Sequence, residues 1–300
     1  MATAKAWLIS STCSTNNCTC SMCCLNNSVH PLPAKEGTHA SSSRSVIVNH
    51  MPATIENQVV LVIGASSGIG RETAALFARE GARVMASARR EERLRELQES
   101  LAREGRTVET LVADAADASQ MEHLAQVTRE RLGEIDVVVF ATGTNVPDRS
   151  MKRLTTEIWD MMVSVNLNAA YYVTRAVLPA MRERGAGHLI YISSVSGLFA
   201  DVSGAAYQAS KRGLLGLAHA IRVEEKESGI RTCVVCPGLV DTEILDRRPV
   251  KPSAETLAKA LRPEDVAETV WRSPDCHLAP AFPRCRWCRR ICRVDRSRIV

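Results

Sequence analysis

Three observations predict an α/β protein with a doubly wound parallel sheet. Short β-rich runs alternate with longer amphipathic runs from residue 59 onward. The apolar runs VVLVI, VVVF and HLIYI show no polar alternation, which is typical of strands covered on both faces. A glycine-rich turn follows the first of these runs and leads directly into a helical pattern. Repeated strand, helix and strand units of this kind build parallel sheets with helices on both faces.

Each element follows from its local pattern. The β-rich runs predict strands at 59–63, 83–87, 107–112, 136–140, 188–193 and 231–235. The amphipathic runs predict helices at 69–79, 91–103, 157–184 and 205–228. The 300 residues are 45% hydrophobic and 24% charged, a composition that supports one domain with a large core, which we place at 51–270.

The distribution of charge and apolar residues excludes two classes of partner. Positive charge gathers at the ends, with eight arginines against two aspartates in 271–300, while 51–270 is slightly acidic. The domain therefore has no charge reason to bind nucleic acid. No stretch approaches the roughly 18 to 20 apolar residues of a membrane span, so we expect no membrane partner.

The first fifty residues predict a disordered or targeting extension. They are rich in Ser, Thr, Asn and Cys and show no helical or strand period. A plastid-type transit peptide fits this acid-poor composition, whereas a disordered tail or an untranslated leader fits the fact that Met51 could open the domain by itself. The expected compartment is accordingly the cytoplasm or the plastid.

The last thirty residues predict an irregular tail rich in Cys and Arg. On paper, four zinc ligands could come from Cys276 or His277 with Cys285, Cys288 and Cys292. Alternation of Cys and Arg without a hydrophobic pattern is more typical of irregular sequence, so we predict no metal site. A nucleic-acid arm is the other interpretation of this arginine cluster.

The turn after the first strand predicts a dinucleotide site. Its glycines let the backbone approach a pyrophosphate, and the following helix presents unpaired amides to it. The residues expected at this site are Gly64, Ser66, Ser67, Gly68, Ile69 and Gly70.

The end of the second strand favours NADP(H) over NAD(H). Ala88 stands where a carboxylate would bind the adenosine ribose, and Arg89 and Arg90 follow it. Arginine can bind a 2′-phosphate with charge-assisted hydrogen bonds. The alternative is a solvated charge run that leads into the next helix.

A Ser, a Tyr and a Lys provide a candidate catalytic group. Ser194 follows a strand, and Tyr207 and Lys211 share one helix face four residues apart. A nearby ammonium lowers the pKa of a phenol by stabilising phenolate, which would make Tyr207 a workable general acid. Taken alone, this Tyr and Lys spacing is common in helices.

At this point the sequence resembles the short-chain dehydrogenase/reductase superfamily. The motifs IGASSGIG, ISSVSG, YQASK and CPGLVDT occur in the order of that family, and the likeness covers roughly residues 55–270. It is most similar to the 3-oxoacyl-thioester (acyl-carrier-protein) reductase type. The resemblance implies a Rossmann fold, with an NADPH-dependent enzyme that reduces a carbonyl to a secondary alcohol.

The resemblance also implies roles for individual residues. Tyr207 would protonate the carbonyl oxygen, Ser194 would hydrogen-bond it, and Lys211 would lower the pKa of Tyr207 and bind the nicotinamide ribose. Asn166, 28 residues before Ser194, would organise a water for proton relay. Further cofactor positions implied in this way are Asp114, Ala115, Gly143, Pro237, Gly238, Val240 and Thr242. Local alternatives are a helix cap at Asp114, a simple turn at 237–238 and a satisfied helix residue at Asn166.

Three departures from the family pattern bear on activity. Ile63 replaces a Thr, and Phe140-Ala141-Thr142-Gly143 replaces Asn-Asn-Ala-Gly. No strand pattern follows the helix near residue 270, so we expect the C-terminal edge strand to be missing. The alternative function is therefore a catalytically impaired, cofactor-binding interaction protein.

The expected partners are a small molecule and further copies of the chain. The substrate would be a small carbonyl or alcohol, or an acyl thioester. Family members associate through the two long helices, here 157–184 and 205–228, which implies a homodimer or homotetramer.

Overall fold

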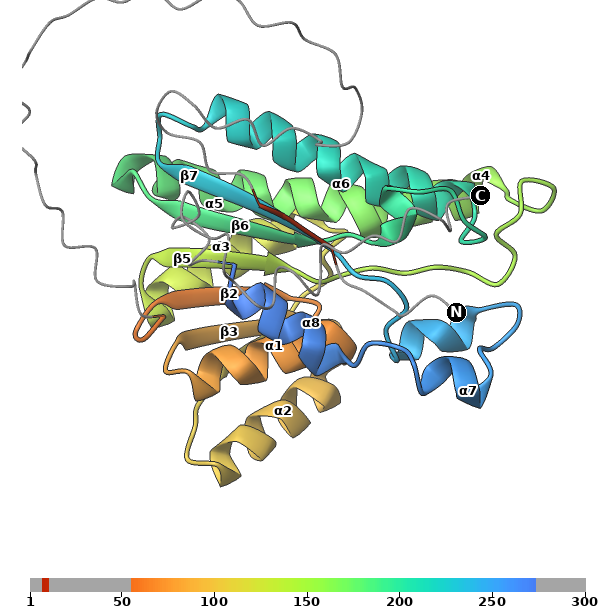
Figure 1. Ribbon diagram of the computed structural model, residues 1–300. Coiled ribbons are helices and arrows are strands. Elements are labelled where there is room, and N and C mark those ends of the chain that lie inside the picture. Colours follow the sequence, from red (N-terminus) through yellow and green to blue (C-terminus); the bar gives the residue numbers. More distant parts are fainter. Residues whose placement is uncertain (1–6, 11–54, 274–300) are drawn as a thin grey trace, which may run out of the picture. The chain divides into compact units, whose positions relative to one another are not determined.

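The structure, a computed structural model, describes residues 7–10 and 55–273. A seven-stranded sheet forms its centre, with the strand order β1-β7-β6-β5-β2-β3-β4 (Figure 1). In this sheet β2 to β7 run parallel, and β1 is antiparallel to its neighbour β7. The strands are β1 (Trp7–Ser10), β2 (Val59–Ile63), β3 (Arg83–Ala88), β4 (Glu109–Val112), β5 (Ile135–Phe140), β6 (Gly187–Ile192) and β7 (Ile230–Cys236).

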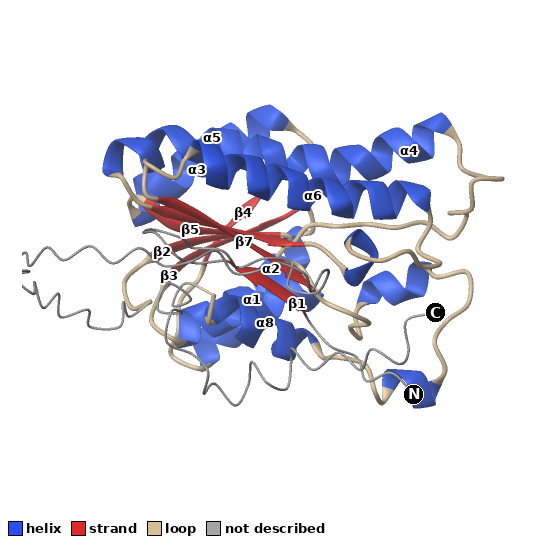
Figure 2. Cartoon of the chain, turned by 45° about the horizontal axis from the view of Figure 1, so that its top comes forward, coloured by secondary structure: helices blue, strands red, loops and turns tan. Residues whose placement is uncertain are grey.

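Helices cover both faces of the sheet (Figure 2). One face carries α3 (Ala118–Leu132), α4 (Thr156–Val163), α5 (Ala169–Arg184) and α6 (Ala205–Glu224). The other carries α1 (Gly68–Arg79), α2 (Glu91–Arg103) and α8 (Pro263–Trp271), and the short α7 (Ala254–Leu257) precedes α8. Among the described helices, none is long and apolar enough to cross a bilayer.

A hydrophobic core lies on each face of the sheet, and β2 contributes to both. Leu61 and Ile63 belong to one buried cluster, whereas Val60 and Val62 belong to the other. Because successive side chains of a strand point to opposite faces, a strand covered on both sides must be apolar at every position. The unbroken VVLVI run is explained by this two-sided burial.

The predicted fold class is confirmed. The strand at 59–63 and the helix at 91–103 have the predicted bounds, and the fourth strand of the sequence, β4, begins at Glu109, two residues later than predicted. The predicted helix at 157–184 is interrupted by a π-helical turn, Ser164–Asn168, between α4 and α5.

The edge beside β7, which the sequence led us to expect open, carries β1. Trp7 pairs with Cys236 and Ser10 with Cys233 in antiparallel register. A strand in this place occupies edge amides and carbonyls that would otherwise be free to pair with another chain. The expectation that 1–50 contains no strand is therefore corrected at residues 7–10. The remaining extension and the tail at 274–300, with its candidate zinc ligands, lie outside the described residues.

A crevice opens where the strand order reverses. β3 and β4 follow β2 on one side, whereas β5 lies on its other side. The chain leaves β2 for α1 on one face and leaves β5 for α4 on the opposite face. The two connections diverge at the carboxyl ends of the strands, and this is where open parallel sheets bind ligands.

One buried hydrogen bond ties α5 to β6. The hydroxyls of Thr174 and Tyr191 are 2.7 Å apart, and both side chains are buried. Thr174 donates its only hydroxyl proton to the carbonyl of Ala170, 2.7 Å away, so Tyr191 is the donor in the pair.

We expect Tyr191→Phe to lower the free energy of unfolding by about 1 kcal/mol, because it removes a neutral buried hydrogen bond with almost no change of volume. Urea unfolding followed by circular dichroism measures the difference. Tyr171→Phe is the matched control, since Tyr171 is half exposed. Equal losses in the two variants would contradict the assignment.

Candidate functional site

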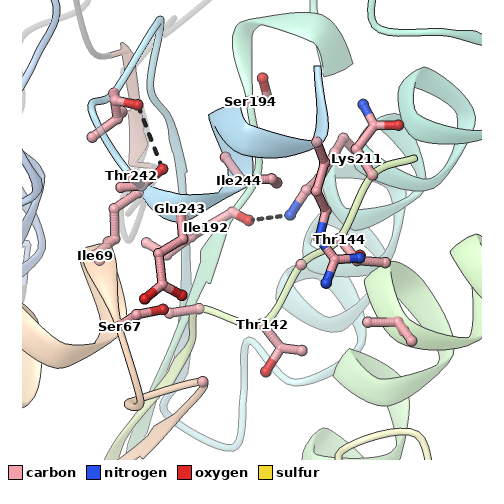
Figure 3. A pocket seen from close by; sticks show the side chains of 18 of the residues that line it. Ser67, Ile69, Thr142, Thr144, Ile192, Ser194, Lys211, Thr242, Glu243 and Ile244 are labelled. Atoms are coloured by element: carbon pink, nitrogen blue, oxygen red, sulfur yellow. Dashed lines mark hydrogen bonds between the residues drawn. The ribbon is translucent and has the colours of Figure 1, made fainter. Parts of the chain in front are cut away.

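The crevice contains a cleft lined by the glycine turn at one end and by Ser194, Tyr207 and Lys211 at the other (Figure 3). Gly64 has a φ of 93°, and a Cβ added to it would lie 2.8 Å from the amide nitrogen of Thr142. A Cβ on Gly70 would lie 2.2 Å from the carbonyl oxygen of Gly64. Both positions require glycine because the backbones of β2, α1 and the loop after β5 pack closely against one another here. The turn leads directly into the N-terminus of α1, whose unpaired amides can bind a phosphate group.

Arg90 lies across this turn. Its guanidinium donates to the hydroxyls of Ser66, at 3.0 Å, and Ser67, at 2.7 Å. It also forms an ion pair of 2.8 Å with Glu243. Figure 3 shows the Glu243 carboxylate pointing toward Ser67. An anionic group thus already lies against the donors that the sequence assigns to a cofactor phosphate.

Glu243 is held ionised in this place. Partial burial acts to raise its pKa, but hydrogen bonds from Arg90 and Ser67, with the charges of Arg90 and Arg93, hold the pKa below its usual value. Arg93 approaches to 3.8 Å. The sequence analysis did not identify Glu243, because nothing in its local sequence indicates a contact with residues 153 positions away.

Asp114 and Arg89 lie on the adjoining wall of the cleft. Their charged atoms are 3.7 Å apart, and Asp114 accepts a hydrogen bond from the amide of Ala116. The cap of α3 is Asp117, whose carboxylate accepts from the amides of Ser119 and Gln120. The side-chain hydrogen bonds of Ser119 and Gln120 lower the pKa of Asp117 to about 2. The helix-cap alternative for Asp114 is therefore wrong, and both Asp114 and Ala115 line the cleft.

The segment after β7 forms the wall opposite the glycine turn. Pro237, Gly238, Val240 and Thr242 all line the cleft. Val240 and Leu261 form a parallel bridge, in which the Asp241 amide donates to the Leu261 carbonyl and the Leu261 amide donates to the Leu239 carbonyl. The amide and carbonyl of Val240 consequently point away from Leu261.

Asn166 organises the other end of the cleft. It lies in the π-helical turn, is fully buried, and accepts a hydrogen bond from the amide of Thr144 at 2.7 Å. Its amide group donates to the carbonyl of Thr144 and to the hydroxyl of Ser210. Such π turns inside α-helices occur frequently at functional sites, because they redirect one side chain out of the helical register. The sequence left open that Asn166 is a helix residue whose hydrogen bonds are simply satisfied. Its hydrogen bonds are satisfied in the structure, and this agrees with a place beside the site.

Lys211 is a buried cation beside Asn166. Its Nζ donates to the carbonyl of Ile192 at 3.0 Å, and burial lowers its pKa to about 8 (Figure 3). A Cβ on Gly143 would lie 2.9 Å from this Nζ and 3.7 Å from Oδ1 of Asn166. Gly143 therefore provides the space that the ammonium occupies.

Tyr207 lies one helical turn before Lys211 and faces the same cleft. The Lys211 ammonium is 5.8 Å from the centroid of the phenol ring. Burial raises the pKa of the phenol, while a hydrogen bond with Ser194 and the charges of Arg248 and Arg149 act to lower it. Lys211 was expected to be the cation that lowers this pKa. In the structure the ammonium is directed at the Ile192 carbonyl, and two arginines act on Tyr207 instead.

Ser194 is the last member of the predicted group. It caps a short 3₁₀ turn, and its hydroxyl donates to Ser196 at 3.1 Å. The Ser196 hydroxyl donates in turn to Asp201 at 2.5 Å. Of the four predicted residues, Ser194, Tyr207 and Lys211 line the cleft, and Asn166 lies buried beside Lys211 with its hydrogen bonds to Thr144.

Several lining residues were not named individually by the sequence analysis: Thr144, Asn145, Arg149, Ser196, Asp201, Ser203, Arg247 and Arg248. They come from the loops after β5, β6 and β7, which have no periodic pattern. In these loops, the adjacent pair Arg247-Arg248 was the sequence feature that could have indicated a binding residue.

Comparison with known proteins gives consistent matches. A family model described as short chain dehydrogenase matches residues 58–252. An uncharacterized oxidoreductase of Staphylococcus saprophyticus subsp. saprophyticus is 32% identical over 218 residues, which cover 71% of this chain and 89% of the relative.

Solved structures agree in fold. A point variant of actinorhodin polyketide ketoreductase with NADPH superposes with a TM-score of 0.65 at 33% identity, over 73% of this chain and 90% of that chain. Levodione reductase superposes with a TM-score of 0.67 at 29% identity, over 72% and 90%.

The buried ammonium of Lys211 generates a prediction about stability and pH. Its folded pKa of about 8 lies below the ordinary value of 10.5, so between these values the unfolded chain binds more protons. Relative to Lys211→Met, the wild-type free energy of unfolding should therefore rise with pH, by about 2 kcal/mol between pH 7.5 and 10.

Urea unfolding at the two pH values measures this difference. Lys259→Met is the control, since Lys259 is exposed and paired with Glu255. A wild-type and Lys211→Met difference that stays constant with pH would show that the ammonium is not destabilised by burial.

Proposed function

The chain belongs to the short-chain dehydrogenase family, and we propose that this oxidoreductase uses NADPH to reduce a carbonyl to a secondary alcohol. One observation carries the proposal. Ser194, Tyr207 and Lys211 line one end of a cleft, with Asn166 buried beside Lys211, and the other end combines the glycine turn with Arg90.

The residues present fit NADPH. The glycine turn and the start of α1 would hold the pyrophosphate, Asp114 and Ala115 would contact the adenine, and Arg90 would hold the 2′-phosphate in place of Glu243. Lys211 would bind the nicotinamide ribose. When bound, NADPH supplies the hydride that is added to the carbonyl carbon.

The chain's own residues would manage the proton. The phenol of Tyr207 would give its proton to the carbonyl oxygen as the carbonyl carbon is reduced, which yields a secondary alcohol. Ser194, which hydrogen-bonds Tyr207, holds the carbonyl oxygen beside the phenol. Asn166 holds the Thr144 backbone, and it would organise the water through which a proton returns to Tyr207.

The proposed substrate is a 3-oxoacyl thioester or a small ketone. The similar ketoreductase with NADPH and the similar levodione reductase have names that describe carbonyl reduction. Both names support the direction of the reaction, and the ketoreductase with NADPH supports the choice of cofactor. We place the protein in the cytoplasm or the plastid.

We further propose a homodimer or homotetramer. Exposed apolar side chains on α4, α5 and α6 lie on helices that cover the same face of the sheet: Trp159, Met161, Tyr171 and Val223. Exposed apolar side chains on one layer of helices support association through that layer. Sedimentation of the full chain measures the oligomeric state.

Tyr207→Phe should reduce turnover of a carbonyl substrate by a factor of at least 100, because it removes the proton donor and leaves the ring in place. Binding of NADPH should change less than threefold. Initial rates of NADPH oxidation and nicotinamide fluorescence measure the two quantities, with Tyr171→Phe as control. Retained turnover in Tyr207→Phe would exclude the proposed role.

Glu243→Gln should bind 2′,5′-ADP about two- to fivefold more tightly than the wild type, because the ion pair that competes for Arg90 is exposed and modest in energy. Binding of 5′-AMP, which lacks the 2′-phosphate, should not change. Calorimetric titration measures both ligands.

The matched control is Glu104→Gln, which removes the exposed ion pair with Arg79, the last residue of α1, at the opposite end of that helix from the turn. If Glu243→Gln changes the affinity for both nucleotides equally, Arg90 does not bind the 2′-phosphate.

A further inference from the structure

Three arginines line the wall of the cleft near Tyr207, and the proposed reaction does not use them as proton donors or cofactor ligands. Arg149 comes from the loop after β5. Arg247 and Arg248 come from the end of the 3₁₀ turn Glu243–Arg247 after β7. Arg149 and Arg248 are both half-buried.

These arginines have no carboxylate partner within the described chain. Arg149 donates to the carbonyls of Val146, at 2.9 Å, and Arg247, at 2.7 Å. Arg247 donates to the hydroxyl of Thr144 at 3.1 Å. By contrast, Arg90 at the opposite end of the cleft already has Glu243.

The charges around this wall are incompletely balanced. Burial and the charge of Arg248 lower the pKa of Arg149. Asp201 is the carboxylate that faces them, and its oxygens already accept from the Ser196 hydroxyl at 2.5 Å and the Ser203 amide at 2.8 Å. Two positive charges therefore face Tyr207 against one carboxylate that other donors occupy.

Partly burying two guanidinium groups without an ionic partner is unfavourable. A guanidinium is also well suited to bind planar or tetrahedral anionic oxygen groups through paired hydrogen bonds. A ligand that brought such a group to this wall would offset both costs, with its carbonyl close to the Tyr207 phenol.

We propose that the substrate is a carbonyl compound carrying an anionic oxygen group, a carboxylate or a phosphate ester, which Arg149 and Arg248 bind while Ser194 and Tyr207 hold the carbonyl oxygen. This assignment of substrate class rests on the proposed carbonyl reduction. It adds two binding residues to the site and a charge requirement to the substrate.

Two matched pairs of compounds test the requirement. Acetoacetate and methyl acetoacetate differ in a carboxylate, and dihydroxyacetone phosphate and dihydroxyacetone differ in a phosphate. With the full chain and NADPH, kcat/KM should be at least tenfold higher for the anionic member of one pair. The pair that shows the preference identifies the anionic group as carboxylate or phosphate.

Arg149→Gln and Arg248→Gln should each reduce that anionic-to-neutral ratio at least fivefold. Arg153→Gln is the control, because Arg153 is exposed, lies in the same loop as Arg149 and pairs with Asp148. Arg149→Gln removes hydrogen bonds to two loop carbonyls and could disturb the loops. Arg248 donates no hydrogen bond that holds the described loops together, so Arg248→Gln tests the site without that risk.

Calorimetric titration of the same anions gives a readout independent of turnover. Binding that depends on the arginines, without turnover, would support the anion site and contradict the proposed reduction. Turnover without preference for the anionic member, or a preference that survives both substitutions, would overturn the inference and leave the reduction intact. If the chain neither binds these anions nor turns over any of the four compounds, both the anion site and the proposed reduction are overturned.

Discussion

Strand order reverses between β2 and β5, so the chain leaves these neighbouring strands toward opposite faces of the sheet. The cleft between the two connections is bordered by the glycine turn on one side and by the loop after β5 on the other. Most groups that we assign to cofactor or substrate reach this opening from strand ends, and α6 adds Tyr207 and Lys211. Their mutual placement is therefore inherited from the sheet.

The two ends of the cleft differ in whether their positive side chains have carboxylate partners. At the glycine turn, Arg90 is already matched by Glu243, so a cofactor phosphate would exchange one anion for another. At the catalytic end, Lys211 is buried against a carbonyl, and Arg149 and Arg248 face Tyr207 without a free carboxylate. The pKa of Tyr207 thus depends on the charges of Arg149 and Arg248, the same loop arginines that line the proposed substrate site.

The features of the fold and the site that depend on local sequence pattern could be predicted. Two-sided burial makes β2 uniformly apolar, and the fixed spacing of Tyr207 and Lys211 on α6 places both in the cleft. The sequence was insufficient where distant segments meet without a pattern. The pairing of β1 with β7, the contact of Glu243 with Arg90 and the direction of the Lys211 ammonium each depend on tertiary packing.

The central claim is that this cleft binds a nicotinamide dinucleotide and distinguishes it by the 2′-phosphate. The most direct measurement is a titration of the full chain with NADPH and then NADH, followed by nicotinamide fluorescence. We expect saturable binding of both, with NADPH at least tenfold tighter. Equal affinities would contradict the role of Arg90, and binding of neither would contradict the assignment of the cleft itself.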